Sequence, residues 1–126
     1  MKSSILTKKN VFLILRYLKK SLYISVKIEL IGNVRDLVND GAKGFIIRSD
    51  IPNIFCAGLD IKELYQKPTE DMVDFWHLLQ DSWHTFYSLK QPMVAAVNGA
   101  AIAGGCLIAC CADTRIMIDN PKTRIG

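Results

Sequence analysis

The sequence lacks long apolar runs, although hydrophobic residues occupy 50% of its 126 positions. No stretch reaches 18 consecutive apolar residues, whereas a helix that crosses a bilayer needs about 20. A transmembrane segment is therefore not expected. The hydrophobic content instead indicates one small globular domain with a buried core.

Metal-ligating residues are also scarce, with four cysteines and two histidines in the whole chain. The cysteines form no CxxC pair, and His77 and His84 lie seven residues apart without a third ligand near them in the sequence. We therefore expect no metal site. Cys106, Cys110 and Cys111 share an apolar run, where free thiols are usually buried, so a reducing compartment is the simplest inference.

Phosphate-binding motifs are missing too, because the chain contains neither a GxGxxG nor a GK[ST] sequence. Dinucleotide-binding and P-loop proteins place their phosphates on such glycine-rich loops. A phosphate-loop function is therefore not predicted.

Positive charge is concentrated at the N-terminus, although the whole chain carries a formal charge of +4. Residues 1–30 contain seven Lys or Arg and one acidic residue, whereas residues 31–126 contain nine basic and eleven acidic residues. The basic residues form no stripe interleaved with aromatics, so nucleic-acid binding is not expected. Residues 1–30 are predicted to be a basic leader, either an organelle-targeting segment or a disordered or non-native extension.

The rest of the chain alternates between strand and helix patterns. Short apolar runs at residues 44–49, 93–97 and 112–118 predict strands buried in a sheet. A helix is expected to end at Asp40-Gly41, because glycine accepts the left-handed conformation that closes helices. A further helix is predicted from Gly104-Gly105 to Cys111. This alternation indicates an α/β fold with short crossover connections.

Two helices are predicted between residues 60 and 91. The first begins at Asp60, has a capping-box spacing to Glu63, and is expected to end at Pro68. The second begins near Thr69 and carries apolar residues at three- and four-residue steps, which predicts a stripe that faces the core. The stripe consists of Met72, Phe75, Trp76, Leu79, Trp83, Phe86 and Tyr87.

Two glycine-bearing loops, residues 55–60 and 98–105, each lead from a predicted strand into a predicted helix. A helix N-terminus presents unpaired backbone N–H groups and the positive end of the helix dipole. Either loop could therefore bind an anion or a developing oxyanion, and its glycines would let a ligand approach the backbone. A simple turn before each helix is the alternative explanation.

Together the two loops resemble the signatures of the crotonase, or enoyl-CoA hydratase/isomerase, superfamily. The first signature is matched by Phe55-Cys56-Ala57-Gly58-Leu59-Asp60. The second is matched, in order and spacing, by Ala96-Val97-Asn98-Gly99, Ala103-Gly104-Gly105-Cys106 and Asp113-Thr114-Arg115. The AGLD form, the Trp-containing helix and residues 119–126 are most similar to the mitochondrial delta isomerases of this superfamily. The resemblance covers residues 31–126 and implies the N-terminal part of a crotonase-like spiral of repeated ββα units.

This resemblance also implies a ligand, a coenzyme A thioester, with no further cofactor. The backbone N–H groups of Leu59 and Gly104 would form an oxyanion hole for an enolate. The implied substrate-binding residues are Ala57, Gly58, Leu59, Asp60, Ile61 and Gly104. Lys62 matches a CoA-contacting lysine of related hydratases, but a solvated helix lysine explains its position at least as well.

The implied activity shifts the double bond of a 3-enoyl-CoA to the 2-trans position in fatty-acid β-oxidation. In the delta isomerases a glutamate moves the proton, and it is expected beyond Gly126, so no catalytic residue is assigned within the chain. Glu63 is better explained as a cap partner and Glu70 as a surface residue. A non-catalytic acyl-CoA-binding or subunit-interaction protein is the alternative, and a hydratase, which would need two downstream glutamates, also stays open.

The resemblance further implies a protein of the mitochondrial matrix that forms a homotrimer at full length. Residues 1–30 do not resemble the opening strand pair that precedes the first helix in this family. The sequence therefore predicts an incomplete crotonase-like domain over residues 31–126.

Overall fold

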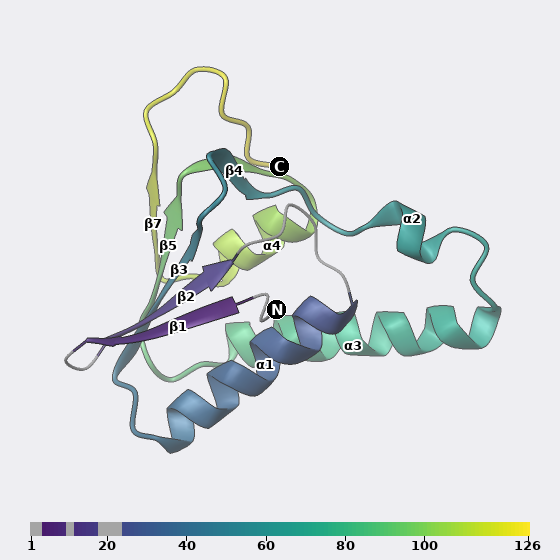
Figure 1. The fold of residues 1–126 in the computed structure, drawn as a ribbon, viewed down its shortest axis with the longest axis horizontal. Coiled ribbons are helices and arrows are strands. Elements are labelled where there is room, and N and C mark those ends of the chain that lie inside the picture. The colour runs from purple at the N-terminus through teal and green to yellow at the C-terminus, as the bar shows by residue number, and fades with distance from the viewer. Residues whose placement is uncertain (1–3, 10–11, 18–23) are drawn as a thin grey trace.

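Five strands form the main sheet of the computed structural model, which describes residues 4–9, 12–17 and 24–126, with side chains from residue 31 onward apart from Glu63. Across the sheet they are β1 (Ser4–Lys9), β2 (Phe12–Tyr17), β3 (Gly44–Ser49), β5 (Met93–Val97) and β7 (Thr114–Met117) (Figure 1). β1 and β2 are antiparallel, and the other neighbouring pairs are parallel. The short strands β4 (Asn53–Cys56) and β6 (Gly99–Ala101) form a second, parallel pair.

In the part of the chain that the structure describes, four helices connect these strands: α1 (Ile24–Asn39), α2 (Ile61–Leu64), α3 (Thr69–Tyr87) and α4 (Gly104–Cys111). α1 and α3 lie side by side, whereas α2 and the start of α3 extend away from the sheet (Figure 1). Among the helices that the structure describes, none is long and apolar enough to cross a membrane.

The chain repeats one pattern, in which a main-sheet strand is followed by a small-sheet strand and a helix. β3, β4 and the α2–α3 pair form one such unit, and β5, β6 and α4 form the next. β7 begins a third unit, after which Ile125 forms a bridge with Ala101 of β6. The predicted α/β fold of repeated ββα units is confirmed.

Local sequence explains several of these boundaries. Gly41 has φ +82°, and its N–H donates to the Val38 carbonyl while the Ala42 N–H donates to the Leu37 carbonyl. This pair of bonds is the Schellman arrangement that closes α1 at the predicted glycine. The predicted strands at 44–49 and 93–97 are also confirmed, and the third is shorter than predicted, Thr114–Met117.

The core lies between α1, the sheet and α4. In β5 burial alternates along the strand, with Met93, Ala95 and Val97 turned inward. The other members of this core cluster are Val34 and Leu37 of α1, Phe45 and Ile47 of β3, Phe86 of α3, and Phe55, Cys56, Ala101, Ile108, Ala109 and Ala112 around β4, β6 and α4. This core fixes β4 and β6 beneath the start of α4.

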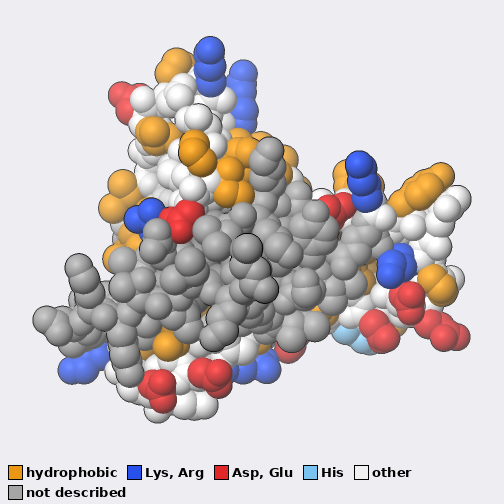
Figure 2. Space-filling view, in the orientation of Figure 1, with side chains coloured by type: hydrophobic (Ala, Val, Ile, Leu, Met, Phe, Trp, Pro, Cys, Tyr) orange, Lys and Arg blue, Asp and Glu red, His pale blue; other side chains and the backbone are white. Residues whose placement is uncertain are grey.

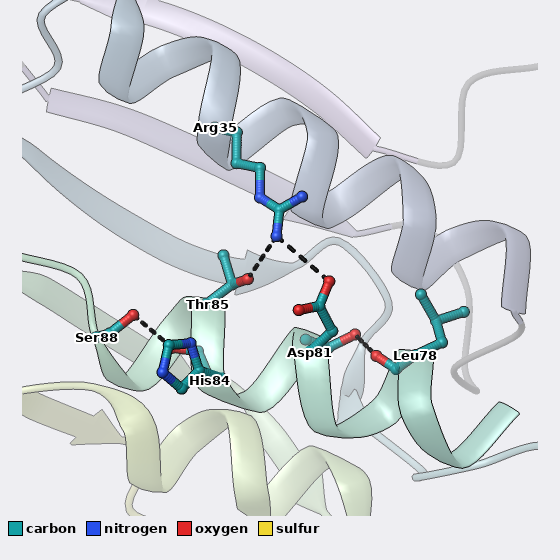
Figure 3. A network of polar contacts seen from close by, with 7 residues as sticks. Arg35, Leu78, Asp81, His84, Thr85 and Ser88 are labelled. Carbon is teal, nitrogen blue, oxygen red and sulfur yellow. Dashed lines mark hydrogen bonds and ion pairs between the residues drawn. The ribbon is translucent and has the colours of Figure 1, made fainter. Parts of the chain in front are cut away.

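An exposed polar network also joins α1 to α3 (Figure 3). Arg35 Nη2 donates to Asp81 Oδ2 at 3.3 Å and to Thr85 Oγ1 at 3.4 Å. Because both charged side chains are more than half exposed, this pair adds at most about 1 kcal/mol. The helices are therefore joined mainly by apolar packing.

The N-terminal expectation is corrected by the structure. Residues 4–9 and 12–17 form the strand pair that was expected to be missing, and β2 continues the sheet by pairing with β3 in parallel. The run Phe12-Leu13-Ile14-Leu15 has high β propensity, which the Lys-rich composition of the segment obscures. Residues 1–3, 10–11 and 18–23 of the predicted leader lie outside the described residues. A targeting role for residues 1–30 stays a prediction.

The aromatic stripe of α3 is only half buried. Phe75 and Phe86 are inside, but Trp76 and Trp83 are each 49% exposed and Tyr87 is 75% exposed. The predicted core-facing stripe is therefore wrong for these three residues, because the apolar arc is wider than the face that packs. Apolar side chains are also exposed on α2 and around β7 (Figure 2).

Candidate functional site

The two glycine-bearing loops lie against each other. They leave the neighbouring strands β4 and β6, and the Ile102 N–H donates to the Cys56 carbonyl at 2.8 Å. A Cβ on Gly58 would lie only 2.9 Å from the Ile102 carbonyl oxygen and 3.4 Å from the Gly104 nitrogen. Gly58 also has φ +90°, so both conformation and space require glycine. Gly58, which precedes Leu59, therefore lies against Gly104, the first residue of α4.

The second loop ends in a tight turn that opens α4. The Gly105 N–H donates to the Ile102 carbonyl at 2.8 Å, which closes a β-turn over Ala103 and Gly104. A Cβ on Gly105 would lie 2.4 Å from the Cys56 carbonyl oxygen, so the helix begins directly over the end of β4. Gly104 is the first residue of α4, and its N–H therefore has no acceptor within the helix.

The predicted binding residues occupy both sides of this contact. Gly58 and Gly104 are buried, Leu59 and Asp60 are partly buried, and Ala57 is exposed. The structure therefore brings these five together around the two loops. Ile61, the sixth, begins α2 and is 79% exposed. Its role as a binding residue stays a prediction.

Asp60 caps the start of α2, as predicted from its position. Its Oδ1 accepts from the Lys62 N–H at 2.9 Å, and the expected bond from the Glu63 N–H stays a prediction. The reciprocal bond from the Glu63 side chain lies outside the described side chains. The helix ends at Leu64, ahead of the predicted Pro68, because Gln66 adopts φ +57° and Pro68 instead caps α3. Lys62 is exposed, as a solvated lysine would be.

Asp113 and Arg115 hold the C-terminal end of α4, through contacts that were not predicted although their motif was noted. Arg115 Nη1 donates to the carbonyls of Ala112 at 2.7 Å and Ala109 at 3.3 Å, which caps the C-terminus of α4. Asp113 Oδ2 accepts from the Met93 N–H at 2.7 Å. A cation just after a short helix and an acid beside a strand are the sequence features that could have indicated these contacts.

The cysteines of α4 are more exposed than predicted. Cys110 is exposed and Cys106 and Cys111 are partly buried, whereas Cys56 of β4 is fully buried. Desolvation, then a hydrogen bond to Cys110 and the charge of Cys110, raise the pKa of the Cys106 thiol. The two sulfur atoms lie 3.9 Å apart. Desolvation, followed by the charge of Cys110, also raises the pKa of Cys111.

Two further features lie away from the loops. His77 and His84 are both exposed on α3, and among the described side chains no three potential metal ligands gather. A groove of about 600 Å³ lies between the C-terminal ends of α1 and α3, and none of its lining residues belongs to either loop. Neither feature adds to the candidate site.

Comparison with known proteins places this geometry in a family. The enoyl-CoA hydratase/isomerase family matches residues 17–126. "Enoyl-CoA delta isomerase 1, mitochondrial" of Mus musculus is 40% identical over 107 residues, which cover 84% of this chain and 37% of that protein. The protein of the same name from Homo sapiens is 38% identical and is covered over 35% of its length.

Solved structures agree with the sequence comparisons. The crystal structure of human mitochondrial delta3-delta2-enoyl-CoA isomerase matches 99% of this chain and 51% of that chain, with a TM-score of 0.95 and 31% identity. An enoyl-CoA hydratase from Bacillus anthracis matches with a TM-score of 0.81 at 23% identity, which shows the fold alone. The chain thus spans about half of the solved isomerase and little more than a third of the curated relatives. With the matched span and the shared fold, the chain belongs to the enoyl-CoA hydratase/isomerase family.

Proposed function

We propose that this chain supplies the oxyanion hole of an enoyl-CoA delta isomerase that acts in fatty-acid β-oxidation. The N–H groups of Leu59 and Gly104 are the proposed donors to the thioester oxygen. The single observation that carries the proposal is the contact between the two loops, in which Gly58 packs against Gly104 at the start of α4. The 40% identity to the mouse isomerase supports the choice of reaction.

The reaction needs such donors because its intermediate is an enolate. Removal of a proton from C2 of a 3-enoyl thioester leaves negative charge on the thioester oxygen, and return of the proton at C4 gives the 2-trans product. Oriented backbone N–H groups stabilise this charge more than they stabilise the neutral carbonyl. Loss of one donor in comparable sites costs about 2.7–4 kcal/mol of transition-state stabilisation.

The base that moves the proton is expected, from the family resemblance, beyond Gly126. Glu70 lies exposed in the first turn of α3, where a negative charge suits the helix dipole, and we assign it no catalytic role. The alternative function is that of a protein that binds acyl-CoA without catalysing a reaction. A hydratase would use the same two donors and differs in the acid–base groups.

Substrate binding follows from the same loops. We propose that Ala57, Gly58, Leu59, Asp60, Ile61 and Gly104 contact the thioester and the adjoining part of coenzyme A. No metal or other cofactor is needed for this chemistry. By analogy with the named relatives we also propose a mitochondrial location, in the matrix, and a homotrimer for the full-length protein.

The test uses a 3-oxoacyl-CoA, because its acidic C2 proton lets the bound ligand become an enolate without a protein base. We expect a new near-ultraviolet absorbance from the bound enolate. A CoA thioether of the same chain length, which lacks the thioester oxygen, is expected to bind more weakly. Binding of both ligands without an enolate band would refute the oxyanion hole and favour the non-catalytic alternative.

A second measurement addresses the reaction itself. Incubation with a 3-enoyl-CoA is expected to yield the conjugated 2-trans thioester, which absorbs in the ultraviolet, provided that the protein carries the base. Formation of a 3-hydroxyacyl-CoA from a 2-enoyl-CoA would instead identify a hydratase. Enolate formation without either product would leave the oxyanion hole in place and support the binding protein.

A further inference from the structure

Ala103 adopts a backbone conformation that alanine rarely takes. Its φ is +48° and its ψ is −111°, at the position of the Ile102–Gly105 turn where glycine dominates. A non-glycine residue in such a region is strained and persists only when its surroundings enforce the conformation. The strained residue directly precedes the proposed donor Gly104.

Three backbone hydrogen bonds enforce the conformation. The Ala103 N–H donates to the Gly126 carbonyl at 2.7 Å, and the Ile102 N–H before it donates to Cys56 at 2.8 Å. The Gly105 N–H closes the turn at 2.8 Å. These bonds fix the peptide group before Ala103. The peptide group after it is fixed within α4, where the Leu107 N–H donates to the Ala103 carbonyl at 3.0 Å.

The alanine methyl group lies beside Gly58, although Ala103 itself is exposed. A Cβ placed on Gly58 would lie 3.1 Å from the Ala103 Cβ, closer than ordinary van der Waals contact. The methyl group therefore borders the Gly58 residue, which directly precedes Leu59. It lies where the two loops that carry the proposed donors approach each other.

We propose that Ala103 is a positioning residue whose methyl group acts as a spacer between the loops and sets the separation of the Leu59 and Gly104 N–H groups. This inference rests on the proposed function. Glycine at this position would relieve the backbone strain but would remove the spacer and widen the range of turn geometries. Stability and oxyanion binding should therefore change in opposite directions, which a purely structural role would not produce.

The experiment compares Ala103→Gly and Ala103→Ser with the unmodified protein, and uses Ala100→Gly of β6 as a control for the added backbone freedom. Three quantities are measured: the midpoint of urea unfolding, the enolate absorbance with a 3-oxoacyl-CoA, and the affinity for the CoA thioether. Ala103→Gly is expected to unfold at the same or higher urea concentration. Its affinity for the enolate is expected to fall by about 10- to 100-fold, the scale that a misplacement of 1 Å can cost. Its affinity for the thioether is expected to stay unchanged.

Ala103→Ser keeps a Cβ and is expected to retain enolate binding, as is Ala100→Gly. The inference is overturned if Ala103→Gly binds the enolate as the unmodified protein does, if the serine variant loses as much as the glycine variant, or if thioether affinity falls in parallel. An unmodified protein that forms no enolate refutes the proposed function, and this inference with it.

Discussion

The Met93 N–H donates to Asp113 Oδ2 at 2.7 Å, and the Asp113 N–H donates back to the Met93 carbonyl at 2.9 Å. This reciprocal pair joins the first residue of β5 to the turn between α4 and β7. Since Met93 is only 1% exposed, water cannot easily replace the carboxylate as an acceptor. This pair of bonds therefore connects the C-terminal end of α4, the helix that begins at Gly104, to the main sheet.

Replacing Asp113 should consequently leave a buried N–H without a partner. We expect Asp113→Ala to lower the free energy of unfolding by about 1–3 kcal/mol, and Asp113→Asn, which keeps an acceptor oxygen, to lower it less. Urea unfolding measures both. The exposed Asp119 provides the control, since Asp119→Ala should change stability by about 0.5 kcal/mol or less. Equal losses at the two positions would contradict the role of the Met93 contact.

Gly58 and Gly41 both have a left-handed backbone conformation, with φ +90° and +82°, and can therefore be compared. A Cβ on Gly41 meets nothing within 4 Å, whereas one on Gly58 would be 2.9 Å from a backbone oxygen. Gly41→Ala should therefore cost only the conformational strain, about 1–2 kcal/mol. Gly58→Ala should cost more and should also weaken enolate binding. Unfolding midpoints and enolate absorbance are measured for both variants. Equal values for Gly41→Ala and Gly58→Ala would contradict this prediction.

Phe86 and Tyr87 are neighbours on α3 with opposite environments, 3% and 75% exposed. We expect Phe86→Ala to destabilise the fold by about 3–5 kcal/mol through cavity formation. Tyr87→Ala should change stability by about 0.5 kcal/mol or less. Thermal or urea unfolding of the two variants measures the difference, and a large loss for Tyr87→Ala would show that its ring is packed in solution.

The raised pKa of Cys106 predicts slow alkylation near neutral pH, because the thiolate is the reactive form. Its folded pKa lies above the unfolded value, so this thiol contributes stability below the unfolded pKa that is lost as pH rises through the folded one. Cys110→Ala removes the neighbouring hydrogen bond and charge, and should speed iodoacetamide labelling of Cys106 at mildly alkaline pH. Peptide mass spectrometry measures the rate, and an unchanged rate would leave desolvation as the sole cause.

The hydrophobic pattern of the sequence was sufficient to predict the strands and the helix at the centre of the fold. The runs at 44–49 and 93–97, and the helix opened by Gly104-Gly105, depend on local patterns that the packed structure preserves. β1 and β2 could not be predicted because charge composition outweighed a short β-rich run. The buried positions of α3 are Phe75, Ser82 and Phe86, with Leu79 partly buried between them. The outward positions Trp76, Trp83 and Tyr87 are equally apolar, so sequence alone does not distinguish the two faces.

The candidate site also has a part that the sequence predicted and a part that it did not. The two loops were found because glycine before a helix is visible in the sequence. The strained turn at Ala103 was not, since alanine has no turn preference and its conformation is enforced by bonds to residues distant in the chain. The contact of Asp113 with Met93 likewise joins residues that are 20 positions apart in the sequence, whereas Arg115 caps the helix that ends just before it.

The pairing of residues 124–126 with residues 101–103 has a consequence for the order of events during synthesis. Ala101 and Ala103 donate to the Arg124 and Gly126 carbonyls, at 2.8 and 2.7 Å. A nascent chain that has reached only α4 contains both glycine-bearing loops but not residues 124–126, whose bonds fix the Ala103 turn. Translation must proceed through residue 126 before this geometry can form, so a ribosome-bound chain that carries every signature loop still lacks a shaped site.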